Sequence, residues 1–286
     1  MILIADSGST KTDWVLIDNE KVIASYTTQG LNPFFKKSSE ISEIIKPVFT
    51  DQKINESVEK IFFYGAGCSS EQMKEVIFNG IKPIFSTSEI NIETDLLAAA
   101  RALFKNDQGI AVILGTGAST CLYNGTEIIQ NIKSLGYVFG DEGGGDHLGK
   151  LFITDFLNNN LSDDIKEKFE NTFHLSKDDI LRKVYREPLP NSFLASFCEF
   201  ISNNSEHKQI DSIIKKSFNQ LFKNHICKYP EYKKYKIRVL GSTGFYFEKQ
   251  LKEIAAEFKL KIDLILKNPI KELVDYHLKF DLKSSS

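Results

Sequence analysis

The sequence has few of the residues on which metal-cluster, disulfide-rich and membrane proteins depend. It has four cysteines, and no two of them form a CxxC pair: Cys68, Cys121, Cys198 and Cys227. Histidine does not cluster with them, which argues against a zinc or iron–sulfur site and indicates isolated reduced thiols. No apolar run approaches the ~18–20 residues that a membrane span requires. We therefore expect a soluble, cytoplasmic protein.

An excess of one charge and low-complexity sequence are also missing. The formal net charge is −2, so there is no electrostatic reason to expect nucleic acid or an anionic membrane as a partner. Lysines and acidic residues are spread along the chain, which is typical of a solvated surface. Hydrophobic residues make up 42% of the 286 residues, enough for the core of one large domain or of two smaller ones.

The first thirteen residues contain a small-residue turn between two apolar runs of strand length. Met1–Ala5 is followed by DSGSTKTD, and Trp14–Ile17 resumes the apolar pattern. This pattern predicts a β-hairpin whose turn can present backbone N–H groups to an anion. Asp6 stands where the first strand ends and could hold a metal ion beside that anion. Taken alone, the stretch is equally consistent with a plain polar hairpin.

A second stretch repeats this order. Gly109–Leu114 is an apolar run, GTGAST follows it at Gly115–Thr120, and a strand–turn–strand pattern continues to Gln130. In the opening segment a third strand, Val22–Tyr26, occupies the matching position. The repetition predicts two similar domains that face one another, each presenting a small-residue hairpin to one bound anion.

Three further positions are candidates for ligand contact. The apolar run Lys60–Tyr64 ends in small residues up to Gly67, which leaves space for a ligand to approach. Asn32 lies in a loop bounded by Gly30 and Pro33, as a turn residue or as a ligand contact. Asp95 begins an Ala/Leu-rich helix, where it either caps the helix or directs a rigid carboxylate into a cleft.

Glycine is concentrated in one segment, Ser134–Gly149, which holds six glycines in sixteen residues. Such density indicates a hinge or a wall that a ligand approaches closely. Gly144–Lys150 also fits most of a Walker A loop, G-x-x-x-x-G-K. We reject that interpretation because Leu151 replaces the required Ser or Thr and no buried strand precedes the loop.

The C-terminal half is predicted to be a helical region followed by two strands. Apolar and aromatic residues recur at helical spacing over Leu161–Tyr229 and predict core-facing stripes. The strand Ile237–Leu240 runs into a glycine-rich turn at 241–244, which can lie against a flat ring or a phosphate. A helix is expected at Phe247–Phe258, a last strand at Ile262–Leu266, and a final helix that returns to the N-terminal domain.

The order of these motifs resembles that of a known superfamily. DSGSTKT, LGTGAST and VLGSTG follow the order of the phosphate-1, phosphate-2 and adenosine motifs of actin, hexokinase and the 70-kDa heat-shock chaperones. With GDEGGG, TDLLAAA and GLNPFF added, nearly the whole chain resembles N-acetylglucosamine kinases, in the wider group of the benzoyl-CoA reductase activator ATPases. The resemblance implies an α/β fold of two ribonuclease-H-like domains with a central cleft. These are 1–105 plus 269–286, and 106–268 with a helical insert at about 150–230.

The resemblance also implies a set of ligands and the residues that bind them. ATP and Mg²⁺ would be the cofactors, with the metal held by Asp6. The phosphates would be lined from the first domain by Gly8, Ser9, Thr10, Lys11 and Thr12, and from the second by Gly115, Thr116, Gly117 and Ser119. The adenosine would pack against Gly241, Ser242 and Gly244.

For the sugar, the resemblance implies that Asp95 is the catalytic base and that Asn32, Gly67 and Asp141 lie in the sugar site, with Gly136 near an N-acetyl group. The implied reaction is phosphorylation of N-acetylglucosamine at O6, with glucosamine and N-acetylmuramic acid as alternative substrates. The same fold also serves ATPase activators and non-catalytic sugar sensors, and the dispersed cysteines argue against an activator. Tyr137 follows Gly136 where animal enzymes have tryptophan, which leaves the sugar open, and a homodimer is not decided.

Overall fold

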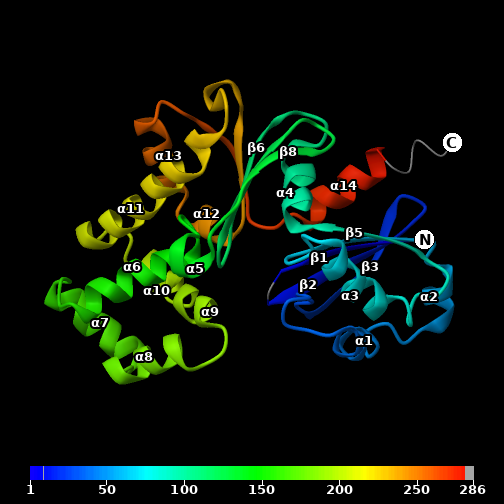
Figure 1. The fold of residues 1–286 in the computed structure, drawn as a ribbon, viewed down its shortest axis with the longest axis horizontal. Coiled ribbons are helices and arrows are strands. Elements are labelled where there is room, and N and C mark those ends of the chain that lie inside the picture. The colour runs from blue at the N-terminus through cyan, green and yellow to red at the C-terminus, as the bar shows by residue number, and fades with distance from the viewer. Residues whose placement is uncertain (9, 281–286) are drawn as a thin grey trace. The chain divides into compact units, whose positions relative to one another are not determined.

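The computed structural model describes residues 1–8 and 10–280, which form two compact units. The first unit comprises Met1–Asn106, Gly125–Glu127 and the segment from Pro269 onward. Its sheet, coloured blue to cyan in Figure 1, has the strand order β3-β2-β1-β4-β5. The strands are β1 (Ile2–Ser7), β2 (Lys11–Asp18), β3 (Lys21–Gln29), β4 (Lys60–Gly65) and β5 (Glu89–Thr94). β1, β2 and β3 form the antiparallel meander that the sequence predicts, and β4 and β5 run parallel to β1.

Both faces of this sheet are covered by helices. Leu3 and Ala5 of β1 pack in a cluster with residues of α1 (Ser38–Ile45) and α3 (Glu71–Ile81). Ile2 and Ile4 point to the other face, against α4 (Asp95–Phe104) and α14 (Ile270–Phe280). A strand that is buried on both faces has a continuous apolar sequence, as Met1–Ala5 does. A short helix, α2 (Gln52–Ser57), precedes β4.

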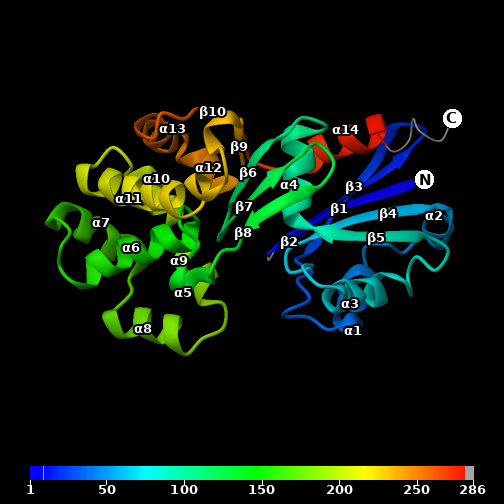
Figure 2. The same ribbon diagram turned by 45° about the horizontal axis from the view of Figure 1, so that its top comes forward.

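The second unit, Asp107–Asn124 with Ile128–Asn268, repeats this plan. Its sheet has the order β10-β9-β6-β7-β8 (Figure 2). β6, β7 and β8 again form an antiparallel meander, and β9 and β10 run parallel to β6. The strands are β6 (Gly109–Leu114), β7 (Ala118–Tyr123), β8 (Ile128–Ile132), β9 (Ile237–Leu240) and β10 (Ile262–Leu266). The matching strand orders confirm the expectation of two ribonuclease-H-like α/β sheets.

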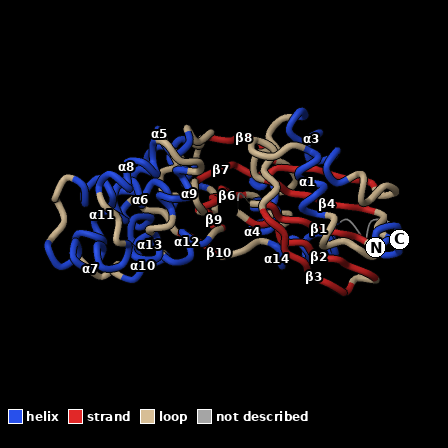
Figure 3. The backbone as a smooth tube through the Cα atoms, turned by 90° about the horizontal axis from the view of Figure 1, so that it is seen from below, coloured by secondary structure: helices blue, strands red, loops and turns tan. Residues whose placement is uncertain are grey.

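Helices dominate the sequence between β8 and β9 (Figure 3). They are α5 (Gly136–Phe139), α6 (Gly145–Leu157), α7 (Asp163–Phe173), α8 (Lys177–Tyr185), α9 (Pro190–Ala195), α10 (Cys198–Asn203), α11 (Lys208–Asn224) and two 3₁₀ turns, η1 (Ile226–Lys228) and η2 (Tyr232–Lys234). α12 (Ser242–Tyr246) and α13 (Glu248–Glu257) follow β9. The predicted aromatic stripe is core, because Phe197, Phe218 and Phe222 are completely buried.

Several predicted boundaries were wrong. Ile41, Ile44, Ile45 and Val48 recur at helical spacing and predict a helix over Ser38–Thr50, but the helix ends at Ile45, because Pro47 has no N–H with which to continue the helical hydrogen bonds. The strand expected at Thr126–Gln130 lies at Ile128–Ile132, and helix formation after β9 already starts at Ser242. Within the described residues, none of the helices combines the length and apolar character needed to cross a membrane. The domain boundaries predicted from the sequence, 1–105 with 269–286 and 106–268, remain a prediction.

Candidate functional site

In the first unit, three parallel strands end at the same edge of the sheet, and a candidate residue lies at or just after the end of each strand. Asp6 is the penultimate residue of β1, Gly67 follows the end of β4, and Asp95 follows the end of β5. The strands are in register there, since Ser7 pairs with Gly65 and Gly65 pairs with Thr94. Ligands of α/β proteins bind at the carboxyl ends of parallel strands. This edge is therefore the candidate site of the first unit.

Asp95 does not serve as the helix cap. The cap is Thr94, whose hydroxyl oxygen accepts a hydrogen bond from the Leu97 N–H at 3.1 Å. Asp95 is the first residue of α4, and the residue is half-buried. Burial raises the pKa of Asp95, although the nearby N–H groups of Asp95 and Leu96 oppose the shift. A rigidly placed carboxylate with a raised pKa has the properties of a general base.

Asp6 lies close enough to two other carboxylates to be affected by their charge. Burial, then Asp95 and then Asp13 raise its pKa to about 7, and Lys11 lowers it by less. A divalent cation would relieve this repulsion, so the donor set fits Mg²⁺. Among the residues that the structure describes, no three His, Cys, Asp or Glu side chains form a metal cluster. Mg²⁺ would therefore depend on ligand phosphates as well as on Asp6.

The hairpin between β1 and β2 has room in front of its glycine. The Gly8 N–H donates to the Lys11 carbonyl at 2.9 Å, and the Gly30 N–H donates to the Thr10 carbonyl at 2.9 Å. A Cβ at Gly8 would meet nothing closer than the Lys11 carbonyl oxygen, 3.8 Å away. Packing within the protein does not require glycine there, and the open space is available to a ligand. The predicted phosphate contact Ser9 lies outside the described residues.

Thr12 and Lys11, also predicted to line the phosphates, are placed differently from each other. The Thr12 hydroxyl is buried and bonds with the Ser7 hydroxyl at 2.8 Å and the Gln29 carbonyl at 3.1 Å. Thr12 thus braces the hairpin from inside. Lys11 is exposed, and its ammonium donates to the Asp13 carboxylate at 2.7 Å.

Asn32 and Gly67 are in direct contact. Gly67 has a φ of +86°, and a Cβ on it would lie 2.5 Å from Asn32 Oδ1. The same oxygen accepts the Phe34 N–H at 3.0 Å, which fixes the orientation of the amide. No described residue accepts a hydrogen bond from Asn32 Nδ2, which leaves this donor for a ligand hydroxyl.

In the second unit the turn between β6 and β7 is tied to two helices. The Gly115 carbonyl accepts the Gly145 N–H at 2.9 Å and the Thr243 hydroxyl at 2.8 Å, and the Thr116 carbonyl accepts the Asp146 N–H at 2.8 Å. Among the described residues other than its two chain neighbours, no atom lies within 4 Å of a Cβ built on Gly115. The hydrogen bonds of its carbonyls therefore hold the turn in place, and the space in front of Gly115 is open to a ligand. Ser119 lies beyond it, in β7, paired with Ile113.

Asp141 lies against this turn. It has a φ of +59°, and its carboxylate accepts hydrogen bonds from the Ser134 hydroxyl and, at 3.4 Å, from the Ala118 N–H. A Cβ on Gly117 would lie 3.0 Å from the Asp141 carboxylate. The Ser134 hydroxyl oxygen also accepts the Gly136 N–H at 3.1 Å. The structure thus brings together Gly117, Gly136 and Asp141.

Glu142, next in the chain, anchors the glycine-rich segment to α11. Its carboxylate accepts hydrogen bonds from Asn224 Nδ2 at 2.6 Å and His225 Nε2 at 2.9 Å. These two bonds lower the pKa of Glu142 although burial opposes the shift. A buried carboxylate that loses its hydrogen-bond donors is strongly destabilised, so the segment is held at Glu142.

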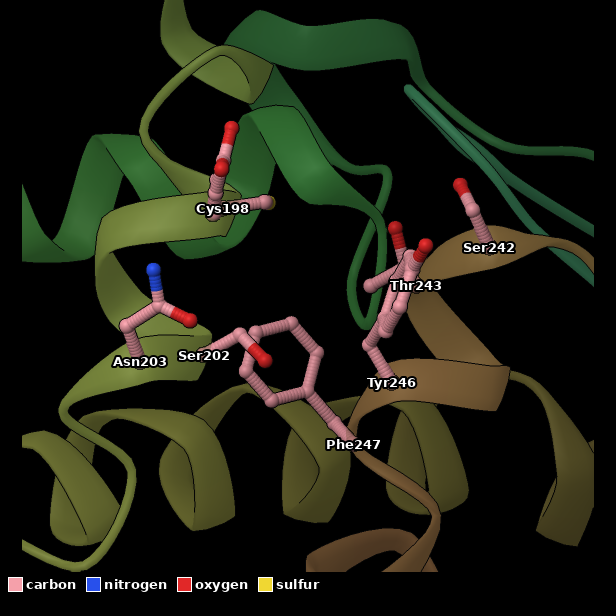
Figure 4. Close-up of a pocket in the computed structure, with 8 residues that line it drawn as sticks. Cys198, Ser202, Asn203, Ser242, Thr243, Tyr246 and Phe247 are labelled. Atoms are coloured by element: carbon pink, nitrogen blue, oxygen red, sulfur yellow. The ribbon is translucent and has the colours of Figure 1, made fainter.

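A pocket of about 420 Å³ lies beside the turn after β9 (Figure 4). α12 lines one side with Ser242, Thr243 and Tyr246, and Phe247 follows. α10 lines the other side with Cys198, Glu199, Ser202 and Asn203. Ser242 is the predicted adenosine residue that lines the pocket, whereas Gly241 and Gly244 pack against Leu114 and Val239. Sequence analysis missed the α10 residues, because helical spacing marks only the buried face.

Comparison with solved structures shows a close relationship. No family model matches the sequence, and no curated protein matches it. A candidate N-acetylglucosamine kinase from Porphyromonas gingivalis is 34% identical and superposes with a TM-score of 0.93, over 98% of this chain and 100% of that one.

Two more distant structures share the fold. They are a candidate N-acetylglucosamine kinase from Chromobacterium violaceum (14% identity, TM-score 0.73, 96% of this chain and 98% of that one) and a ROK family glucokinase from Streptomyces griseus, solved with glucose and AMPPNP (13%, 0.60, 100% and 99%). With one-third identity to the Porphyromonas protein over nearly the full length of both chains, the protein belongs to the N-acetylglucosamine kinase-like family of sugar kinases.

Proposed function

We propose that the protein transfers the γ-phosphate of ATP to O6 of an amino sugar, with N-acetylglucosamine as the first candidate. The observation that carries this proposal is the sheet edge of the first unit, where the Asp95 carboxylate lies near Asp6 and is not used as the helix cap. The similarity to the Porphyromonas protein supports the choice of sugar. Glucosamine and N-acetylmuramic acid are the alternative acceptors.

In this reaction Asp95 accepts the proton of the sugar hydroxyl as that oxygen attacks the γ-phosphorus. Phosphoryl transfer otherwise depends on positioning and on neutralising charge, with little covalent work for the protein. Burial raises the pKa of Asp95, which makes the carboxylate a stronger base at neutral pH than an exposed aspartate. Asn32 Nδ2 and the Asp141 carboxylate would bind sugar hydroxyls, with Gly67 and Gly136 shaping the site.

The nucleotide would be held by open glycine cradles and by the pocket beside α12. Gly8 and Gly115 leave space for phosphates, and the pocket is of a size to receive a nucleoside. The remaining proposed phosphate contacts are Ser9, Thr10, Lys11, Thr116, Gly117 and Ser119, and Thr12 supports their hairpin. Mg²⁺ at Asp6 would neutralise the β- and γ-phosphates. In this proposal both domains, 1–105 with 269–286 and 106–268, contribute residues that bind the two substrates.

The proposal is tested by measuring ADP release with ATP, Mg²⁺ and a panel of sugars. The panel contains N-acetylglucosamine, glucosamine, N-acetylmuramic acid and glucose, and NMR locates the phosphate on each product. We expect turnover with an amino sugar and the phosphate at O6. Sugar binding without turnover would instead identify a non-catalytic sensor, and ADP release that no sugar stimulates would point to an ATPase activator.

Replacing Gly67 with alanine is expected to weaken sugar binding by at least about tenfold, because the new Cβ must displace the Asn32 amide and the backbone there is left-handed. The sugar KM should rise while the ATP KM changes little. Steady-state kinetics with each substrate varied in turn checks this result. Gly125→Ala is the matched control, because that glycine also has a positive φ (+104°) and a crowded Cβ position beside the Asn106 backbone but is not assigned to the sugar site, so its sugar KM should follow the wild type. An unchanged sugar KM in Gly67→Ala would remove Asn32 from the sugar site.

Removing divalent metal is expected to stop turnover and to leave sugar binding intact. The reason is that Asp6 would hold Mg²⁺ for the nucleotide and not for the sugar. Sugar binding is measured by calorimetry and turnover by ADP release, each with EDTA and after Mg²⁺ is restored. Turnover that persists in EDTA would contradict the assignment of Asp6.

A further inference from the structure

A second buried carboxyl, Asp146, lies in the first turn of α6 and is not assigned in the reaction described above. The residue is 1% exposed, and its backbone N–H donates to the Thr116 carbonyl at 2.8 Å. Both carboxyl oxygens are buried, and neither accepts a hydrogen bond from any residue in 1–8 or 10–280. A buried carboxylate without donors is strongly disfavoured, so this group needs a proton or a partner.

The group that faces Asp146 is the carboxyl of Asp141. Two carboxylates repel each other, and they form a hydrogen bond only when one of them carries a proton. Asp141 already accepts hydrogen bonds from the Ser134 hydroxyl and the Ala118 N–H, which suit a charged carboxylate. Asp146 has no such donors, so the geometry places the proton on Asp146.

The other groups around Asp146 do not replace that proton. Lys150, one turn further along α6, directs its ammonium to the Tyr137 carbonyl at 2.7 Å. His147 bonds through Nδ1 to the Ser217 hydroxyl at 2.8 Å, and burial lowers its pKa to about 4, so it is neutral. From α10, Cys198 contributes a neutral thiol, whose pKa is raised to about 12 by burial and by Asp146. The turn between β6 and β7 contributes no charged side chain.

We propose that Asp146 keeps a proton at neutral pH and donates it to the Asp141 carboxylate, which makes Asp146 a positioning residue for sugar binding. This inference rests on the proposed function, because sugar binding by Asp141 is part of that function. Burial and the nearby charge of Asp141 raise the pKa of Asp146 to about 8, although the helix N-terminus favours the charged form. Above that pH both carboxyls are ionised, and their repulsion displaces Asp141 from its sugar-binding position.

Kinetics against pH, in the wild-type protein and in three variants, tests the positioning role. In the wild-type protein the KM for N-acetylglucosamine should be constant up to about pH 8 and then rise by up to about tenfold per pH unit. In Asp146→Asn, whose amide can still donate to Asp141, the sugar KM should stay near the neutral wild-type value across the whole range. Asp146→Ala should raise the sugar KM about tenfold at neutral pH and leave kcat largely unchanged. Asp163→Asn, an exposed carboxyl in the first turn of α7, is the matched control and should follow the wild type.

Infrared spectroscopy tests the proton independently of activity. The difference spectrum between wild type and Asp146→Asn at neutral pH should contain a protonated carboxyl band, and the difference with Asp163→Asn should not. Absence of the band, or a wild-type sugar KM that is flat beyond about pH 9, overturns the inference. So does an Asp146→Asn variant as impaired as Asp146→Ala. If no amino sugar is turned over, the proposed function fails, while the band still reports whether the carboxyls share a proton.

Discussion

Replacing Asp95 with asparagine is expected to lower kcat by about 10²–10⁴-fold while the KM for the sugar changes little. The amide has nearly the same shape and keeps the local packing, but it cannot accept the proton of the attacking hydroxyl. Because the Thr94 hydroxyl caps α4, the substitution should not destabilise the start of that helix. The loss is therefore expected in the chemical step and not in the amount of folded protein.

Steady-state kinetics, with sugar binding measured separately by calorimetry, checks this prediction. Glu89→Gln is the matched control, because Glu89 begins the same strand, β5, and its exposed side chain lies away from the candidate edge. Burial raises the pKa of Asp95, so wild-type kcat should fall on the acid side at a higher pH than an exposed aspartate would give. An Asp95→Asn variant with nearly normal kcat would show that another group accepts the proton.

Replacing Gly241 with alanine is expected to destabilise the protein by about 3–5 kcal/mol, because strain and a clash act together. Gly241 has φ +121° and ψ 159°, a region that other residues hardly populate. A Cβ there would also lie 2.3 Å from the Leu114 carbonyl oxygen, at the carboxyl end of β6, which is the central strand of the second sheet. Neither backbone can move without disturbing β6, and the turn beside the pocket proposed for the nucleoside should shift with it.

Gly115→Ala separates this folding requirement from ligand binding. Gly115 has an ordinary φ, and a Cβ added to it would have no atom within 4 Å, so stability should change by less than about 0.5 kcal/mol. If the phosphates occupy that space, the ATP KM should nevertheless rise about tenfold or more. Urea unfolding and ATP kinetics on both variants measure the two effects. A Gly115→Ala variant with wild-type ATP affinity would remove this turn from the nucleotide site.

The sheets could be predicted from the sequence because their signals are local. Apolar runs of strand length, separated by small-residue turns, mark both meanders, and the repeated order indicates two related units. The helix end near Pro47, which has no N–H to continue a helix, was also visible in the sequence but was predicted too late in the chain. By contrast, Thr94 and Asp95 are adjacent and both suit a cap, and only their backbone conformations show which one caps α4.

The contacts around the candidate site depended on features that the sequence does not display. The backbone at Asp141 is left-handed and contributes to a turn in the chain. After that turn, Asp146 faces the Asp141 carboxyl although it lies five residues later. The α10 residues of the pocket lie on a helix whose spacing identifies Phe200 and Ile201 as core and says nothing of Ser202 or Asn203. Such approaches between distant segments are fixed by tertiary packing and not by local propensity.

The position of α14 has a consequence for how the protein folds while it is being synthesised. Leu273 and Val274 of α14 cover Ile2, Ile4 and Val15, which belong to the first strands to leave the ribosome. Until synthesis reaches α14, that face of the nascent sheet is covered only in part, by Ala98 and Ala102 of α4, and the remainder is a surface for chaperones or for aggregation. β1 and β2 can thus complete their core only after α14 has been translated.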